Sequence, residues 1–206
     1  MTELFLSAFV TLFVVIDPPG CGPIYAGMTS SATPAARRSM AIRATVIAGV
    51  ILVGFALLGA DLLNAMHIEL DAFRIAGGIM LFLIALEMVF EKRTERRNDR
   101  ADKVAADPEH EDVSVFPMAI PMMAGPGAIA SIMLLEGEAE GLQGTMVVLG
   151  ALASVLLLTM ISLLAAGPLM KLFGEKVEAV LTRLLGVLLA ALAAQYVIDG
   201  IRNSFG

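Results

Sequence analysis

The sequence predicts an all-α, polytopic membrane protein with six transmembrane spans, built as two inverted three-helix repeats whose first and fourth helices are broken. The first observation is composition: 58% of the 206 residues are hydrophobic and the mean hydropathy is +0.83. The second is that apolar runs of about 18 residues or more, long enough to cross a bilayer, recur along the chain. The third is that two of these runs carry Pro and Gly near their centres. A soluble all-helical protein with a large core is the alternative, and it cannot easily bury so much apolar sequence.

Six apolar stretches have lengths near the roughly 20 residues that a spanning helix needs. The second, third and sixth contain no proline and predict continuous spans. The first and fourth contain the breaks and predict either a kinked span or a pair of half-helices. The fifth is long, and Gly167-Pro168 is expected to end its membrane part. The stretches are Leu4–Thr29, Met40–Leu63, Asp71–Phe90, Val115–Leu135, Thr145–Phe173 and Val177–Ile201.

The charges in the connections predict an orientation. Basic residues gather in alternate connections, and the connections between them carry acids instead. The basic ones are Arg37, Arg38, Lys92, Arg93, Arg96, Arg97, Arg100, Lys103, Lys171 and Lys176. The acidic ones are Asp61, Glu69, Asp71, Glu136, Glu138 and Glu140. The positive-inside rule places the basic connections in the cytoplasm, so both termini are expected outside.

The chain divides into two membrane repeats, residues 1–90 and 115–206, joined by a charged segment, residues 91–114. This segment mixes both charge signs and lacks aromatic residues, which is typical of a flexible, solvated linker on the cytoplasmic side. A binding site for nucleic acid or lipid is the alternative. It is disfavoured because acids outnumber bases there.

The two halves resemble each other at matching positions. Arg74 and Gly77 open one apolar run, and Arg183 and Gly186 repeat their spacing at an offset of 183 − 74 = 109. The prolines of the two breaks are 126 − 18 = 108 residues apart. Three spans in each half is an odd number, so the second half must cross the membrane in the opposite direction. Many secondary transporters have this inverted-repeat arrangement.

Each break predicts the start of a half-helix near the membrane midplane. Pro is favoured in the first turn of a helix, and Asp is a good N-cap. The run Asp17–Cys21 therefore predicts a helix capped by Asp17, and Gly125-Pro126 predicts one that begins at Gly125. Backbone groups freed at this depth are tolerated only against protein or a water-filled cavity. Both helices would direct a positive N-terminal end into the core.

The two N-terminal ends differ, and the difference predicts a zwitterionic substrate. The Gly125 end has no side chain over its free N–H groups and suits a carboxylate, whereas Asp17 suits an ammonium group, a cation or a proton. The alternative is that Asp17 is a self-satisfied cap with no ligand. Arg74 and Arg183 are possible supporting residues, or else interface anchors. The predicted substrate-binding residues are Asp17, Pro18, Pro19, Gly20, Cys21, Gly125, Pro126, Gly127 and Ala128.

Other classes of site have no support in the sequence. No hydrolase, zinc-protease or Walker A motif is present, so neither an enzyme nor an ATP-driven pump is expected. His67 and His110 lack metal-ligand spacing. No cofactor is expected, and the coupling ion, proton or sodium, stays open. Three further polar residues of the apolar stretches are expected to bond neighbouring helices: Thr159, Ser162 and Gln195.

Three runs together resemble the MarC family of bacterial and archaeal inner-membrane proteins. They are Phe13–Ile24, Arg74–Ala85 and Phe116–Ile129, and the resemblance extends over essentially the whole chain. It implies a six-span permease for small neutral amino acids such as glycine or alanine, related to the lysine-exporter superfamily. Many relatives carry Asn-Ile where this chain has Cys21-Gly22, which removes an amide from the expected site.

The expected function is therefore secondary transport of small neutral amino acids by alternating access around the two breaks. The expected partners are the lipid bilayer and a small zwitterion, without nucleic acid, and the oligomeric state stays open. Two alternatives remain. One is an exporter of other small metabolites or ions. The other is a structural or regulatory membrane protein that transports nothing.

Overall fold

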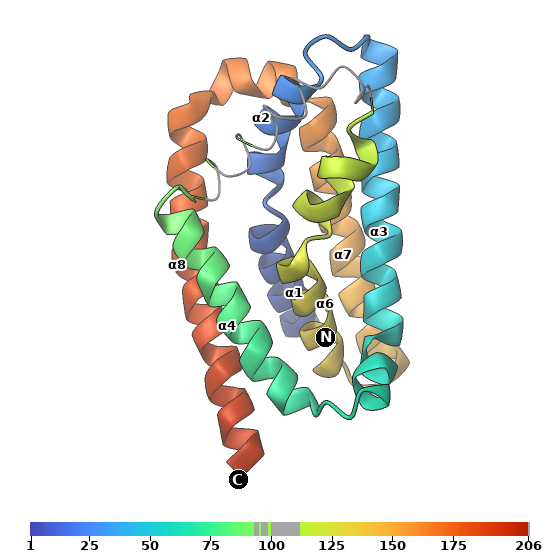
Figure 1. Ribbon diagram of the computed structural model, residues 1–206, viewed down its shortest axis with the longest axis vertical. Coiled ribbons are helices and arrows are strands. Elements are labelled where there is room, and N and C mark those ends of the chain that lie inside the picture. Colours follow the sequence, from blue (N-terminus) through green and yellow to red (C-terminus); the bar gives the residue numbers. More distant parts are fainter. Residues whose placement is uncertain (93–94, 96–98, 100–111, 206) are drawn as a thin grey trace.

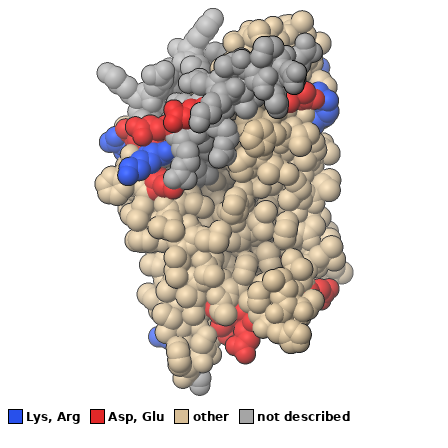
Figure 2. Space-filling view, in the orientation of Figure 1, with Lys and Arg blue, Asp and Glu red and all other residues tan. Residues whose placement is uncertain are grey.

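A computed structural model describes residues 1–92, 95, 99 and 112–205, with the backbone alone for 166–179, and this part of the chain contains helices and no strand. The helices form an elongated bundle with both termini at one end (Figure 1). Five helices are long and apolar enough to cross a membrane, and a bent helix pair makes a sixth candidate. On the face shown in Figure 2, charged residues gather at the two ends and leave an uncharged band between them. The prediction of an all-helical membrane protein is confirmed.

The first half of the chain crosses the bundle three times (Figure 1). Helix α1 (Thr2–Ile16) and helix α2 (Pro18–Met28) follow each other within one candidate span of 27 residues, Thr2–Met28. Helix α3 (Pro34–Ala65) returns to the end that carries the termini, and helix α4 (Leu70–Val89) leaves it again. The first apolar stretch is therefore two helices separated by a break, and the second and third are continuous helices, as predicted.

The second half begins with an irregular helix. Helix η1 (Ser114–Met123), of π type, is followed by helix α6 (Pro126–Gly137) at an angle of 53°. Inside η1, Phe116 and Ile120 have non-helical backbone angles. Each precedes a proline, whose ring disfavours the helical region for the residue before it. The break at Gly125 was predicted, but the irregularity before it was not.

The last reversal of the chain lies close to the predicted end of the fifth span. Helix α7 (Gly141–Leu164) ends before Ala165, and helix α8 (Ala166–Phe205) begins directly after it. The membrane part of the fifth stretch was expected to end at Gly167-Pro168, and α7 ends three residues before this pair. The rest of the stretch, up to Phe173, belongs to α8. Gly167-Pro168 lies in the first turn of α8, where the missing N–H of proline breaks no intrahelical bond. The first part of α8 lies across the end of the bundle, and the rest descends beside α4 (Figure 1).

The helices of one half pack mainly against helices of the other half. Helices α1 and α2 contact α7, η1 and α6 contact α3, and α4 has its most extensive contact with α8. Glycines bring α4 and α8 close together: a Cβ added at Gly78 would lie 2.8 Å from the carbonyl oxygen of Ala193. One added at Gly186 would lie 3.1 Å from the carbonyl oxygen of Ala85. Small residues at such contacts are typical of membrane helix pairs.

The predicted linker falls largely on residues outside the described part of the chain, namely 93–94, 96–98 and 100–111. The described ends of this segment lie at the end of the bundle opposite the termini (Figure 1). Which end faces the cytoplasm stays a prediction from the charges.

Asp112 joins the start of η1 to α3. Its Oδ1 accepts a hydrogen bond of 2.9 Å from the N–H of Ser114, and its Oδ2 lies 2.8 Å from Nη1 of Arg43. Burial acts to raise the pKa of the Asp112 carboxyl, but the hydrogen bonds from Ser114 and the charge of Arg43 hold it below 3.8. The ionised carboxylate therefore links the start of η1 to α3.

Asp112→Asn is expected to lower the melting temperature slightly at neutral pH. Because the folded pKa lies below the unfolded one, the contribution of the carboxylate is present above pH 3.8 and is lost as pH falls through the folded pKa. The difference in melting temperature between variant and wild type should therefore shrink on acidification. It is measured in detergent across a pH series, with exposed Asp61→Asn as the control. A difference that is the same at every pH would contradict this assignment.

Candidate functional site

Asp17 forms the break between α1 and α2. Its backbone is left-handed, with φ 60° and ψ 65°, a conformation that Asp adopts more readily than most residues. Its N–H donates to the carbonyl oxygen of Phe13 at 2.9 Å, which ends α1. Its Oδ1 accepts from the N–H of Gly20 at 3.2 Å, which begins α2. Asp17 therefore caps α2 as the sequence predicts, and it is only 2% exposed.

The local sequence explains why this carboxylate lies over the first turn of α2. Pro18 and Pro19 have no N–H, so Gly20 supplies the first backbone donor of the helix. A Cβ on Gly20 would lie 2.3 Å from Oδ2 of Asp17, so only glycine lets the carboxylate come this close. The run Asp-Pro-Pro-Gly therefore specifies both the break and the place of its charge.

Cys21, Gly22 and Ser162 fix the break against its surroundings. The fully buried thiol of Cys21 donates to the carbonyl oxygen of Ile16 at 3.4 Å, which satisfies a terminal acceptor of α1. The hydroxyl of Ser162 in α7 donates to the carbonyl oxygen of Pro18 at 2.7 Å. A Cβ on Gly22 would lie 2.8 Å from Oγ of Ser162. Cys21-Gly22 thus has a packing role at the position where many relatives were expected to carry Asn-Ile.

Ser162→Ala is expected to lower stability by about 1 kcal/mol, or about 2–4 °C in melting temperature. The substitution removes the donor to the carbonyl oxygen of Pro18 and leaves that buried acceptor with one bond fewer. Thermal unfolding in detergent measures the effect. Ser154→Ala is the matched control in the same helix, because the Ser154 hydroxyl is exposed and bonds only its own helix. Equal losses in the two variants would contradict an interhelical role for Ser162.

Gly125 forms the second break. It is extended, with φ −83° and ψ 172°, and serves as the N-cap of α6 without a capping side chain. Pro126 occupies the first helical position, and the N–H of Ile129 donates to the carbonyl oxygen of Gly125 at 3.0 Å. A Cβ on Gly125 would lie 2.3 Å from the carbonyl oxygen of Pro121, so the chain turns too tightly for any side chain. The predicted start of the half-helix is confirmed.

The start of α6 packs beside the first break. A Cβ on Gly127 would lie 3.3 Å from Cγ1 of Val15 in α1 and 2.5 Å from Cδ1 of Ile84 in α4. Val15 comes two residues before Asp17, and Gly127 two residues after Gly125. Both unwound segments lie at about half the height of the bundle (Figure 1). The structure therefore brings the two predicted breaks together in the interior, and Ala128 beside them is 2% exposed.

The two predicted supporting arginines lie near opposite ends of the α4–α8 pair. Nη1 of Arg74 is 2.9 Å from Oδ1 of Asp71, near the start of α4. Arg183 pairs with Glu91, which follows the end of α4. These ion pairs hold both guanidinium groups near the ends of the bundle, as the interface-anchor interpretation expects. A supporting role at the breaks stays a prediction.

Three polar residues were expected to bond neighbouring helices, and only one of them does. Ser162 bonds a neighbouring helix as predicted. Thr159 donates to its own helix, to the carbonyl oxygen of Val155, and Gln195 bonds Asp199 on its own helix. In the described part of the chain, no group of three or more His, Cys, Asp or Glu side chains is placed to hold a metal ion. His67 lies in a turn at the end of α3, and His110 is outside the described residues.

Comparison with known proteins gives the family. Residues 2–205 match the family described as MarC family integral membrane protein. This chain belongs to the MarC family. It is 33% identical over 202 residues to a UPF0056 membrane protein of Methanocaldococcus jannaschii, with 98% of each chain covered. It is also 31% identical to the UPF0056 membrane protein YvbG of Bacillus subtilis, with 100% of this chain and 97% of the relative covered.

A third MarC-type relative is the UPF0056 inner membrane protein YhgN of Escherichia coli, 32% identical with 98% of each chain covered. Family and relatives establish an integral, multi-pass membrane protein. Their descriptions do not name a substrate or an activity. No solved structure matches this chain.

Proposed function

We propose that this MarC-family protein is a secondary transporter of small neutral amino acids such as glycine and alanine, working by alternating access around its two half-helix N-termini. The observation that carries the proposal is the close approach of two helix starts, at Asp17 and Gly125, inside a bundle of membrane-spanning helices. Discontinuous helices at the midplane are where such transporters bind substrate. We propose no catalytic reaction for this site.

The chemistry of the two starts favours a zwitterion. Helix α6 begins without a capping side chain, so its N-terminal end can receive a carboxylate. Helix α2 begins under the buried carboxylate of Asp17, which can attract an ammonium group. A buried charge inside a membrane protein is expensive and commonly marks a pathway for substrate or ion. A small side chain on the substrate suits the tight surroundings of Gly20, Gly125 and Gly127.

The proposed mechanism needs two equivalent halves, and the packing of α4 against α8 supports this. Gly78 lies against Ala193 in the same way that Gly186 lies against Ala85. Both differences, 186 − 78 and 193 − 85, equal 108. This is also the offset between the prolines of the two breaks, 126 − 18 = 108. A two-fold axis in the membrane plane would exchange such contacts, so we propose an inverted repeat.

The contacts between the other helices have the same reciprocal form. The broken span α1–α2 packs on α7, the second helix of the other half, and the broken span η1–α6 packs on α3. In alternating access, one half rocks against the other around the fixed site. We propose an inner (plasma) membrane location with both termini outside, as the basic connections favour.

Uptake by purified protein in liposomes tests the proposal. Labelled glycine and alanine should accumulate above the level in empty liposomes, with or without an imposed proton or sodium gradient. A gradient that raises the rate would identify the coupling ion. Absence of uptake under all of these gradients would contradict the proposal and favour a non-transporting membrane protein. Transport of an ion or of an unrelated metabolite instead would contradict the assigned substrate class alone.

A further inference from the structure

Helix α8 lies along the outer edge of the bundle, so that one side of it faces away from the other helices (Figure 1). Its inward side holds the buried residues Leu189, Ala193 and Tyr196. Its outward side carries exposed residues at alternating spacings of three and four, namely Leu181, Leu184, Leu188, Ala191, Gln195, Ile198 and Arg202. This spacing is the heptad pattern of a coiled-coil seam, and these residues are called the α8 seam below.

Gln195 lies deep within the apolar part of the α8 seam. A Cβ added at Gly78 of α4 would lie 2.8 Å from the carbonyl oxygen of Ala193 and 3.1 Å from the backbone nitrogen of Val197. Gln195 comes midway between Ala193 and Val197, so it lies at the height of Gly78. Gly78 comes 78 − 70 = 8 residues after Leu70, the first residue of α4. It is therefore about 12 Å into a helix about 30 Å long, which is also the thickness of the hydrocarbon core of a bilayer.

An exposed amide at this depth is costly for a single copy surrounded by lipid. Nε2 of Gln195 donates to Oδ1 of Asp199 at 2.8 Å. A carboxamide has two N–H donors and an acceptor oxygen, so this bond uses only part of its capacity. Lipid tails supply neither donors nor acceptors. The exposed residues in the middle of α4 are apolar instead: Ala76, Ile79, Met80, Phe82, Leu83 and Leu86. Gln195 therefore indicates that protein, and not lipid, covers the α8 seam.

We propose that the α8 seam binds the α8 seam of a second copy of this chain, so that the protein forms a two-fold dimer in the membrane. Copies inserted into one membrane have the same orientation, so the two α8 helices run parallel about an axis along the membrane normal. In such a symmetric contact each residue near the axis faces its own counterpart. The two Gln195 amides then meet, and each can donate to the oxygen of the other, because an amide is complementary to itself.

The order of residues along the α8 seam suits a two-stranded pair. Leu181, Leu188 and Gln195 occupy a positions of the heptad, and Leu184, Ala191 and Ile198 occupy d positions. One polar residue at an a position of an apolar seam fixes the register and the number of strands. Small residues allow close approach of membrane helices, and Ala191 supplies one beside Gln195. Side-chain amides that bond across the contact strengthen it further.

The charges near the outer end of the α8 seam are also complementary. Arg202 ends the seam, and Asp199 lies three residues before it, at the adjacent e position. In a parallel pair the e position of one helix flanks the seam of the other. Long side chains on a helix lean toward its N-terminus, so Arg202 of each copy can reach Asp199 of the other. Opposite charges therefore meet at this end, amides meet above them, and apolar residues meet along the rest.

Disulfide cross-linking in native membranes tests the pairing. Ala191→Cys places a thiol in the middle of the α8 seam, where its counterpart in the second copy should lie within disulfide distance. Wild-type Cys21 is fully buried and provides the blank. Oxidation should convert most of the Ala191→Cys protein to a covalent dimer. Ala153→Cys is the matched control, because Ala153 is also exposed but belongs to α7, on another side of the bundle. Equal cross-linking of the two variants would overturn the inference.

Substitution of Gln195 tests the register. Energy transfer between donor-labelled and acceptor-labelled copies of the full chain, measured in phosphatidylcholine liposomes over a range of protein-to-lipid ratios, gives the dissociation constant of the dimer. Gln195→Leu should raise this constant by about 10-fold, the loss of the hydrogen bonds between the two amides. Gln143→Leu, the same change at an exposed amide in the first turn of α7, should leave it unchanged.

Three results of this measurement would contradict the proposal. An equal dissociation constant in the Gln195→Leu and Gln143→Leu proteins would overturn the role of Gln195. Monomers at every protein-to-lipid ratio would mean that lipid or a different protein covers the α8 seam. Trimers or larger assemblies would overturn the two-fold pairing. Thermal unfolding of Gln195→Leu in detergent checks that the single copy still folds, as expected for an exposed position.

The dimer and the transport activity can be distinguished. Protein that forms cross-links through Ala191→Cys but accumulates no amino acid in liposomes would support the dimer and contradict the proposed function. Protein that transports glycine or alanine but stays monomeric in the same liposomes would do the reverse.

Discussion

Gly125→Ala is expected to destabilise the protein by about 3 kcal/mol, or about 6–12 °C in melting temperature. The added Cβ would lie 2.3 Å from the carbonyl oxygen of Pro121, which belongs to the backbone and cannot rotate away. The clash can be relieved only by moving η1 relative to α6, at the point where the chain bends by 53°. Thermal unfolding in detergent measures the loss, and uptake in liposomes should fall with it because the start of α6 moves.

Gly54→Ala provides the matched control, because a Cβ there meets no atom within 4 Å. Alanine favours the interior of a helix over glycine by up to about 1 kcal/mol, so this variant should be as stable as wild type or more so. If the two variants melt at the same temperature, the turn at Gly125 does not require glycine. The idea that this tight turn keeps side chains away from the N-terminus of α6 would then be wrong.

The broken spans were predictable because their causes are local. Asp17-Pro18-Pro19 and Gly125-Pro126 combine helix-stopping and helix-starting residues within a few positions, and the structure breaks at those positions. The continuous spans were predictable for a similar reason, since hydropathy alone marks the interior of a membrane helix. Helix α4, Leu70–Val89, differs by one residue at each end from the predicted stretch Asp71–Phe90.

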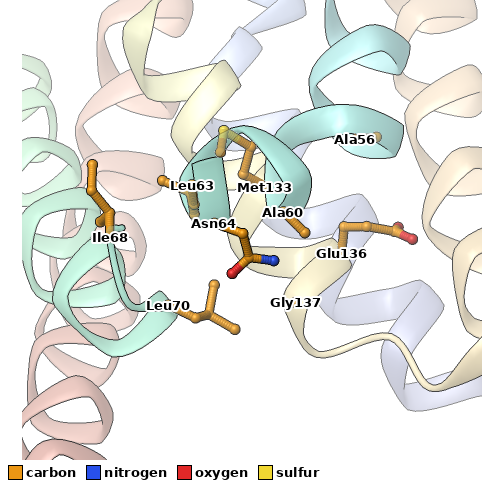
Figure 3. Close-up of a pocket in the computed structure, with 9 residues that line it drawn as sticks. All are labelled: Ala56, Ala60, Leu63, Asn64, Ile68, Leu70, Met133, Glu136 and Gly137. Carbon is orange, nitrogen blue, oxygen red and sulfur yellow. The ribbon is translucent and has the colours of Figure 1, made fainter. Parts of the chain in front are cut away.

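Other parts depend on contacts that the sequence does not display. The bond from Ser162 to Pro18 joins residues 144 positions apart, and its geometry is known only once α2 and α7 are packed. The cavity of about 230 Å³ between these helices' ends likewise needs α3, α4 and α6 in place (Figure 3). The irregular helix η1 had a visible signal, because Pro117 and Pro121 both disturb the residue before them. The turn at Ala165 also had a signal, because Gly167-Pro168 follows it within three residues, although apolar sequence continues through the turn itself.

The role of the Asp17 charge can be separated from its role as a cap. Asn keeps an oxygen that can accept from Gly20, is as good an N-cap, and tolerates the left-handed backbone. Asp17→Asn should therefore melt close to wild type. Ala cannot cap the helix, which lowers the free energy of unfolding by about 1 kcal/mol. Its strain in the left-handed backbone lowers it by about 1–2 kcal/mol more. Asp17→Ala should melt about 4–12 °C lower.

The rate of transport is expected to depend on the charge at position 17 and not on the stability of the protein. If the Asp17 carboxylate receives the ammonium group of the substrate, Asp17→Asn should lose about 10- to 100-fold in uptake efficiency, the loss of one charged hydrogen bond. Its pH dependence of uptake should also change. Wild-type uptake and an unaltered pH profile in Asp17→Asn would show that the carboxylate is only a cap. The substrate-recognising end of the site would then have to be the uncapped start of α6, which Gly125 keeps free of any side chain.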